Sequence, residues 1–592
     1  MLDIARKKID AVAARMRAAL GRHELLLIPA ALGIGCFAGV AVSLISWAAQ
    51  FAHTAIYGLP LDVRLSAHAA VEPAAALIAP ALGGLVVGWM EWTRGKRKLP
   101  SAVDPVEANA LRGGAMSLRD SVAVSVQTLI SNGCGASVGL EAGYTQIGAG
   151  AASALGSRVG LRRNELRLLV GCGAAAGIAA AFNAPLAGAF YASELVVGSY
   201  SVGAAAPILA AAISAAVTAR HISGAPYSIE APAVATESLG QSFALVALAL
   251  LIGLIGVVVM HVCAFAERLL NRTKLPAWLT PALGGLCVGA LGIITPQTLA
   301  AGHGAMLLDL TWNMSATLIA FIIVAKLTAC VISLASGFRG GLFFASLFVG
   351  SLLGKLYAVL VAAYGASFGF ALDPTSSALT GMATLGVAIV GGPLTMTFLV
   401  LELTRDFHVT ATALAACIVT SVCVRTIFGH SFSTWRLHLR GETVRGADDV
   451  GWIRNLTVAS MMRAEIATVR EGATVEECRK LFKLGSHDAL FITDEQNAYR
   501  GLALPRDVFS SDLDAAAHST EIAALARCSD RALLGAMNVV AAMQCFDEVE
   551  AEVLAVIDNE QDRSPIGSLC EAYARRRYIE ELNRSLGTHP QA

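Results

Sequence analysis

A glycine-centred motif occurs twice in this chain, about 200 residues apart, and both copies lie in apolar sequence. The first copy has glycines at 139 and 148 and the second at 341 and 350, so both hold a nine-residue step. Glycine interrupts helices and lets backbone groups approach closely. A glycine break that opens a helix inside a membrane is typical of a binding site for a small ion. The repetition therefore predicts two related halves whose broken helices build one site.

A second pair of matching positions follows each copy. Pro185-Leu186 precedes Glu194-Leu195, and Pro393-Leu394 precedes Glu402-Leu403, again with nine residues from proline to glutamate. Glycine-rich repeats can also serve only to bring helices together. That interpretation accounts for many of the 56 glycines but not for a spacing that both halves keep. Because the two glutamates are duplicated, we expect them to have a structural role.

The composition is that of an integral membrane protein. Of the 592 residues, 55% are hydrophobic and 15% are charged, whereas soluble domains carry about 25% charge. The formal net charge is zero, which gives no reason to expect nucleic acid as a partner. The lipid bilayer is the expected environment.

The charges are unevenly distributed, which predicts three regions. Residues 1–23 combine basic residues with apolar ones near helical spacing and predict an amphipathic cytoplasmic helix. Residues 24–445 are mostly apolar and predict the membrane domain, while the more charged residues 446–592 predict a cytoplasmic domain. A basic cluster at 94–98 predicts a cytoplasmic loop. Heavy use of Ala, Gly and Arg suggests a bacterial source, and hence the inner membrane.

The apolar region divides into long and short segments. A full span needs about 20 apolar residues, and the segments expected to meet that length are 25–52, 70–92, 241–266, 276–294, 315–336 and 409–428. Shorter apolar helices, broken by Gly and Pro, are expected at 118–131, 141–155, 167–181, 185–197, 202–219, 341–362, 376–391 and 393–404. Short helices are tolerated at membrane depth where they are packed in protein or line a cavity. Paired broken helices in two halves indicate a transport site near the midplane.

From about residue 452 the pattern changes to alternating strands and helices. One unit has a helix near 474–484 and a strand at 489–493, and a second has a helix near 532–543 and a strand at 553–557. This predicts a small α/β domain built from two similar units.

The first glycine break can bind an anion without Lys or Arg. Residues 131–141 read SNGCGASVGLE, so glycines let backbone N–H groups converge where a helix N-terminus adds about half a positive charge. Residues 340–343 supply N–H groups from the other half. Glu141 can occupy the anion's place and vacate it when protonated, which makes it a candidate gate or proton carrier. The alternative role is a helix cap that faces water.

Other functional classes find little support. A membrane enzyme, or a sensor whose core is the tail, would need a nucleophile–base pair or a metal cluster, and the sequence offers neither. A cation transporter would need acidic clusters at the midplane, where only isolated carboxylates occur. We therefore expect a transport protein that is not an enzyme and needs no cofactor.

At this point the chain resembles the CLC family of chloride channels and chloride/proton exchangers, over about residues 25–445. The resemblance rests on four segments: residues 174–188, the helix that begins with residues 139–141, residues 340–343, and residues 392–404. Residues 455–580 resemble a CBS pair, a module that often binds adenine nucleotides. The resemblance implies an all-α polytopic membrane protein with two halves of inverted topology, and a C-terminal α/β CBS-pair domain.

The resemblance also implies a homodimer of the bacterial type, with one pathway per subunit for chloride or a similar small anion. Glu141 is the implied gating residue. The residues expected to form the anion site are Ala102, Gly139, Leu140, Glu141, Ala142, Gly341, Leu342, Phe343 and Ser433.

Departures from the family pattern bear on the mechanism. Ala102 stands at the family's anion-contacting serine, and Ser433 near its central tyrosine. The exchangers' inner proton glutamate aligns with Leu195, which cannot carry a proton. Leu195 favours channel-like conduction gated by Glu141. The alternative is a chloride/proton antiporter in which water or Glu194 replaces the inner acid. The anion preference stays open.

The tail departs from its family too. Leu504 stands where a threonine is expected before Asp507, and Tyr573 where an aspartate is expected. In the family, the threonine and the aspartate hold the ribose of a nucleotide. Because this chain has neither at these two positions, an adenine nucleotide at the CBS pair is possible but is not required.

Overall fold

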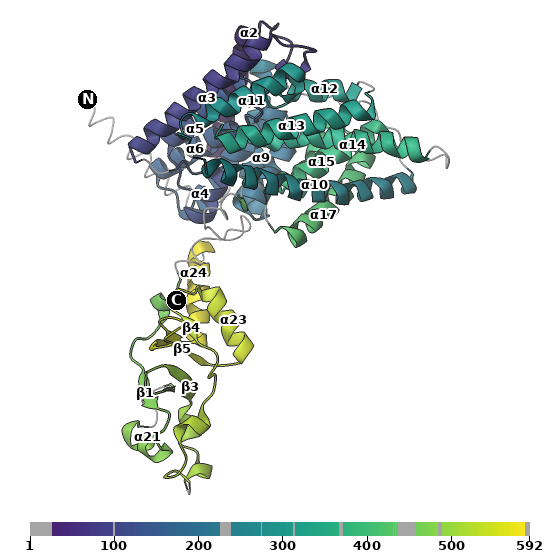
Figure 1. Ribbon diagram of the computed structural model, residues 1–592. Helices are drawn as coiled ribbons and strands as arrows, with labels where there is room; N and C mark the ends of the chain where they lie inside the picture. Colours follow the sequence, from purple (N-terminus) through teal and green to yellow (C-terminus); the bar gives the residue numbers. More distant parts are fainter. Residues whose placement is uncertain are drawn as a thin grey trace, which may run out of the picture. The chain divides into compact units, whose positions relative to one another are not determined.

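A computed structural model describes residues 27–98, 101–224, 238–273, 275–311, 314–365, 371–429, 431, 434–435, 456–483, 488–514 and 516–586. The amphipathic helix predicted at 1–23 lies outside these residues. The chain separates into two compact units, residues 1–449 and 450–592, the first built of helices and the second of helices and strands (Figure 1).

The described helices of the first unit form two series in the same order. The first series is α2 (Ile28–Tyr57), α3 (Pro73–Lys96), α4 (Pro105–Leu111), α5 (Leu118–Gly133), α6 (Glu141–Val159), α7 (Arg163–Phe182), α8 (Pro185–Tyr191) and α9 (Val202–Ser223). The second series is α10 (Leu239–Asn271), α11 (Thr280–Ile294), α12 (His303–Thr311), α13 (Ala316–Ser336), α14 (Phe343–Gly365), α15 (Pro374–Val390), α16 (Pro393–Thr404) and α17 (Phe407–Ile427). Each series thus runs from a long helix, through a very short third one, to the broken helices.

Counterparts in the two series contact one another. Helix α3 packs along α11, and α8 packs against α16. Gly139, before α6, pairs with Gly341, before α14, in an antiparallel bridge. An antiparallel bridge between equivalent residues is what a two-fold axis generates. The halves predicted from the repeated motif are therefore present, and they meet through matching elements.

Eight described helices are long and apolar enough to cross a membrane: α2, α3, α7, α9, α10, α13, α14 and α17. Three segments expected to be short, 167–181, 202–219 and 341–362, belong to this set. The prediction was wrong for α7 because the helix begins four residues before the apolar run, at a polar first turn in which Glu165 accepts from the N–H of Arg162. The span predicted at 276–294 was also wrong, since Pro276 starts a turn there and α11 begins only at Thr280.

The second glycine of each motif copy is a packing residue. A methyl group on Gly148 of α6 would overlap the carbonyl oxygen of Gly173 in α7, and one on Gly173 would overlap that of Gly148. Gly350 of α14 and Gly381 of α15 show the same reciprocal contact. The nine-residue step therefore combines two functions. The first glycine lies at the break, and the second allows the new helix to lie directly on its neighbour.

The second unit contains two three-stranded sheets of the same topology. In one, β1 (Ala467–Arg470) pairs in parallel with β2 (Leu490–Thr493), which pairs antiparallel with β3 (Tyr499–Ala503). In the other, β4 (Leu533–Leu534), β5 (Val553–Ile557) and β6 (Pro565–Cys570) repeat this order. The helices are α20 (Val458–Met461), α21 (Val475–Leu481), α22 (Pro505–Val508), α23 (Val539–Val549) and α24 (Glu571–Leu586).

This confirms the predicted α/β domain of two similar units, with one correction. The helix predicted near 532–543 begins only at Val539, because the Asn538 side chain accepts from the N–H of Ala541 and caps it there. Part of the region before it forms β4.

The packing of the motif glycines gives a first prediction. Replacing Gly350 with leucine should destabilise the first unit by about 3 kcal/mol or more, because the side chain has no space beside Gly381. Gly33→Leu is the matched control, since a side chain there meets nothing within 4 Å. The measurement is the yield of monodisperse protein in detergent and its melting temperature. Equal behaviour of the two variants would contradict the packing role.

Candidate functional site

The two glycine breaks are held against each other by backbone hydrogen bonds. The Gly139 N–H donates to the Gly341 carbonyl at 2.9 Å, and the Gly341 N–H donates to the Gly139 carbonyl at 3.3 Å. The first loop is also fixed from behind, since the Asn132 amide donates to the Val138 carbonyl at 2.8 Å. Helices α6 and α14 begin two residues after the paired glycines. Their N-termini are therefore brought to the same place.

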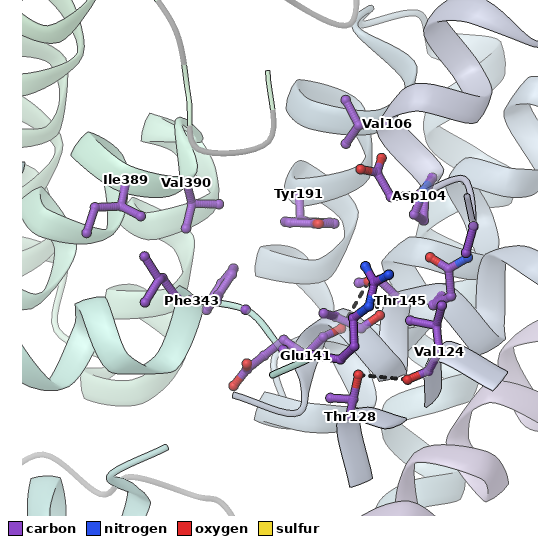
Figure 2. A pocket seen from close by; sticks show the side chains of 18 of the residues that line it. Asp104, Val106, Val124, Thr128, Glu141, Thr145, Tyr191, Phe343, Ile389 and Val390 are labelled. Atoms are coloured by element: carbon purple, nitrogen blue, oxygen red, sulfur yellow. Dashed lines mark hydrogen bonds between the residues drawn. The ribbon is translucent and has the colours of Figure 1, made fainter. Parts of the chain in front are cut away.

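A cavity of about 180 Å³ lies where these N-termini meet (Figure 2). Six of the predicted site residues line it: Ala102, Glu141, Ala142, Gly341, Leu342 and Phe343. Gly139 and Leu140 are buried and do not line it, and the Gly139 N–H is occupied by the bridge. Ser433 lies outside the described residues.

Several backbone N–H groups at the cavity are not used for pairing. Those of Ala142, Leu342 and Phe343 donate to no backbone carbonyl in the described part of the chain. The first N–H groups of a helix have no intrahelical acceptor, and together they carry about half a positive charge. Two helices of 19 and 23 residues present such ends here. The arrangement can bind a small anion through N–H groups.

Glu141 is the first residue of α6, and only 3% of it is exposed. Its carboxylate folds back over Gly139, where even a methyl group would overlap Oε2. Oε2 has no hydrogen-bond partner among the described residues. The alternative role as a cap in contact with water does not fit this burial. A buried carboxylate oxygen without a partner costs free energy, which marks Glu141 as a functional candidate.

Six polar residues of the cavity were not among the predicted site residues: Asp104, Thr128, Thr145, Gln146, Tyr191 and Arg339. In Figure 2, Thr145 lies close to Glu141, one turn along α6, while Asp104 and Tyr191, the last residue of α8, lie farther from it. Arg339 carried a signal that could have been used, since it stands directly before the second Gly-Gly pair. Tyr191 carried none, because its place depends on how α8 packs.

The duplicated glutamates cap helices of the opposite half. Glu402, on α16, accepts from the N–H groups of Leu186 and Ala187 at the start of α8, both at 2.9 Å. Glu194 lies in η3 (Ala192–Val197), a π-helical turn that continues α8, and accepts from the N–H groups of Leu394 and Thr395 at 2.9 Å. The Thr395 hydroxyl adds a hydrogen bond of 2.6 Å to Glu194. The contacts are those of the structural role that we expected.

The structure also places Leu195 and two tail residues that were compared with the family pattern. The Leu195 side chain lies near Gly391, before the start of α16. In the second unit, the Asp507 carboxylate is paired with the Arg527 guanidinium at 2.9 Å. Tyr573, on α24, is 37% exposed and lies under the Arg576 guanidinium.

Comparisons with known proteins agree with this geometry. Residues 82–425, more than half of the chain, match the family described as "Voltage gated chloride channel". The voltage-gated ClC-type chloride channel ClcB of Escherichia coli is 31% identical over 380 residues, which are 62% of this chain and 88% of that protein.

Two solved structures share the fold. A slow cyanobacterial Cl⁻/H⁺ antiporter matches 70% of this chain and 97% of its own, with a TM-score of 0.62 and 22% identity. A eukaryotic CLC transporter matches 92% of this chain and 97% of its own, with a TM-score of 0.55 and 16% identity.

The reciprocal caps give a second prediction. Glu402→Gln should lower the stability of the first unit by about 1–2 kcal/mol, because it removes a charged acceptor from two N–H groups. Glu165→Gln is the matched control, since Glu165 makes a similar but exposed contact within its own helix. Thermal unfolding in detergent compares the two. A melting temperature lowered equally in both variants would contradict a special role for the contact between the halves.

Proposed function

The chain belongs to the voltage-gated chloride channel family, whose members are anion transporters and channels rather than enzymes, and on that premise we propose that it conducts chloride or a similar small anion through the cavity between α6 and α14, with Glu141 as the gate. The observation that carries the proposal is the meeting of two helix N-termini at one buried carboxylate, whose Oε2 has no hydrogen-bond partner among the described residues. N–H groups hold an anion without the full charge of a lysine, so the anion can leave again.

Gating follows from competition at the cavity. The charged Glu141 carboxylate and an anion compete for binding to the same N–H groups, and their negative charges repel each other. Protonation removes the charge of Glu141, after which the anion is the stronger ligand. Lower pH on the side from which Glu141 is reached should therefore open the pathway.

We favour channel-like conduction because no inner proton acid is evident. Leu195 occupies the position of that acid and cannot titrate. The Glu194 carboxylate accepts three hydrogen bonds from α16, so releasing it to carry a proton would uncap that helix. The alternative is a chloride/proton antiporter in which water, or Glu194 after release, links Glu141 to the interior. The cyanobacterial antiporter that shares the fold favours keeping this alternative.

Further parts of the proposal concern the surroundings of the site. We propose that Gly139 and Leu140 support the N–H groups from behind, and that Ser433 reaches the same pathway. The membrane domain is proposed to span 24–445 and the CBS pair 446–592, with the amphipathic segment 1–23 and the tail both in the cytoplasm. We also propose a homodimer in the bacterial inner membrane. An adenine nucleotide at the tail would raise the melting temperature of the full chain.

Flux into liposomes tests the transport function directly. Purified protein should release chloride down its gradient while the external pH is recorded. Chloride release without proton movement is expected for the channel, and proton uptake driven by a chloride gradient would establish the antiporter instead. Absence of any anion flux would refute both.

A third prediction concerns the gate. Chloride flux through the unmodified protein should rise as the pH falls, because the protonated fraction of a single carboxyl changes about tenfold per pH unit above its pKa. Glu141→Gln, which imitates the protonated form, should keep the flux high and remove this dependence. Glu107→Gln is the matched control, a buried glutamate of α4 that pairs with Arg112 and does not line the cavity. An unchanged pH dependence in Glu141→Gln would show that Glu141 is not the gate.

A further inference from the structure

Arg339 is the one cationic side chain among the described residues that line the cavity. It directly precedes the Gly-Gly pair of the second break. Two carboxylates, Asp104 and Glu141, line the same cavity. An entering anion therefore meets one guanidinium and, while Glu141 is charged, two carboxylates. Among the described cavity residues, Arg339 is therefore the side chain whose charge attracts an anion.

The Arg339 side chain is anchored on one side and open on the other. Its Nη2 donates to Glu91 Oε1 at 3.1 Å, and the Gln127 amide donates to the same oxygen at 2.9 Å. The remaining guanidinium N–H groups make no hydrogen bond within the described part of the chain, and 30% of the side chain is exposed. The Arg339 backbone N–H donates to the Ser131 hydroxyl at 3.2 Å, which fixes the start of the side chain.

Glu91 also changes what Arg339 can do. A bare guanidinium in a narrow pathway would hold an anion too tightly for rapid release. Pairing with Glu91 offsets the positive charge but leaves the other N–H groups as donors. Ala102, across the same cavity, has no hydroxyl to donate. Among the described cavity residues, Arg339 is the charged side-chain donor, and its contact with Glu91 fixes its geometry.

We propose that Arg339 binds the permeating anion and makes the pathway prefer flat oxyanions, with nitrate as the test case, over chloride. The inference rests on the proposed function, since it names the substrate class of the same cavity. A guanidinium is a planar fork whose parallel N–H groups match two oxygens of a trigonal anion. Chloride is a sphere, so it can accept from both N–H groups only if they converge on one atom, which bends both hydrogen bonds. Lysine has the charge without the fork.

Paired flux measurements in liposomes test this preference. Nitrate and chloride flux are measured at the same gradient and pH for the unmodified protein, Arg339→Lys and Arg339→Gln. The nitrate-to-chloride ratio is expected to exceed one in the unmodified protein. It should fall about tenfold, equivalent to about 1.4 kcal/mol, in Arg339→Lys although the charge is kept. Arg339→Gln should lower the flux of both anions.

Two further variants keep the test decisive. The double variant Arg339→Gln/Glu91→Gln removes both charges, and a low ratio in it would show that an unpaired Glu91 is not the cause. Arg94→Lys is the matched control, because Arg94 pairs with Asp120 near Glu91 and does not line the cavity. A ratio that is unchanged in Arg339→Lys, or that falls equally in Arg94→Lys, would overturn the inference while chloride conduction stands. Absence of flux for both anions in the unmodified protein would refute the proposed function itself.

Discussion

Two hydrogen bonds between Gly139 and Gly341 join the halves of the first unit at the glycine break that precedes α6 in one half and α14 in the other. Each bond uses the backbone of one break to satisfy the other, so neither glycine is left with an exposed polar group in an apolar surrounding. The pairing also fixes where α6 and α14 begin. The cavity, its N–H groups and the position of Glu141 all depend on this short bridge.

The four broken helices differ in how their N-termini are treated. The ends of α8 and α16 are closed by Glu402 and Glu194, each supplied by the other half. Among the described residues, no carboxylate of the opposite half accepts from the first N–H groups of α6 or α14, and the Glu141 carboxylate lies at the start of α6. A carboxylate at a helix N-terminus can therefore serve two purposes in this fold. A carboxylate that stays bound makes a joint, and under our proposal a carboxylate that can leave makes a gate.

The sequence allowed the halves, the membrane class and the place of Glu141 to be predicted, because each depends on local spacing or composition. The partners of Glu194 and Glu402 could not be predicted, since they lie about 200 residues away and no periodicity reports them. Tyr191 enters the cavity only through the packing of α8. Helix α7 was predicted too short because hydropathy does not detect a polar first turn. Family resemblance supplied the expectation of a dimer and the assignment of the tail as a CBS pair, which spacing alone did not indicate.

The exchange of glutamates between the halves has a consequence for biogenesis. Leu186 and Ala187 are synthesised more than 200 residues before Glu402, their acceptor. At about 5–20 residues per second, the ribosome needs on the order of 10–40 s to cover that interval. During that time the first half lies in or beside the insertion machinery with an open helix end. Bound water or another protein must supply acceptors for that end until the second half arrives, and the first half by itself has no Glu402 to close it.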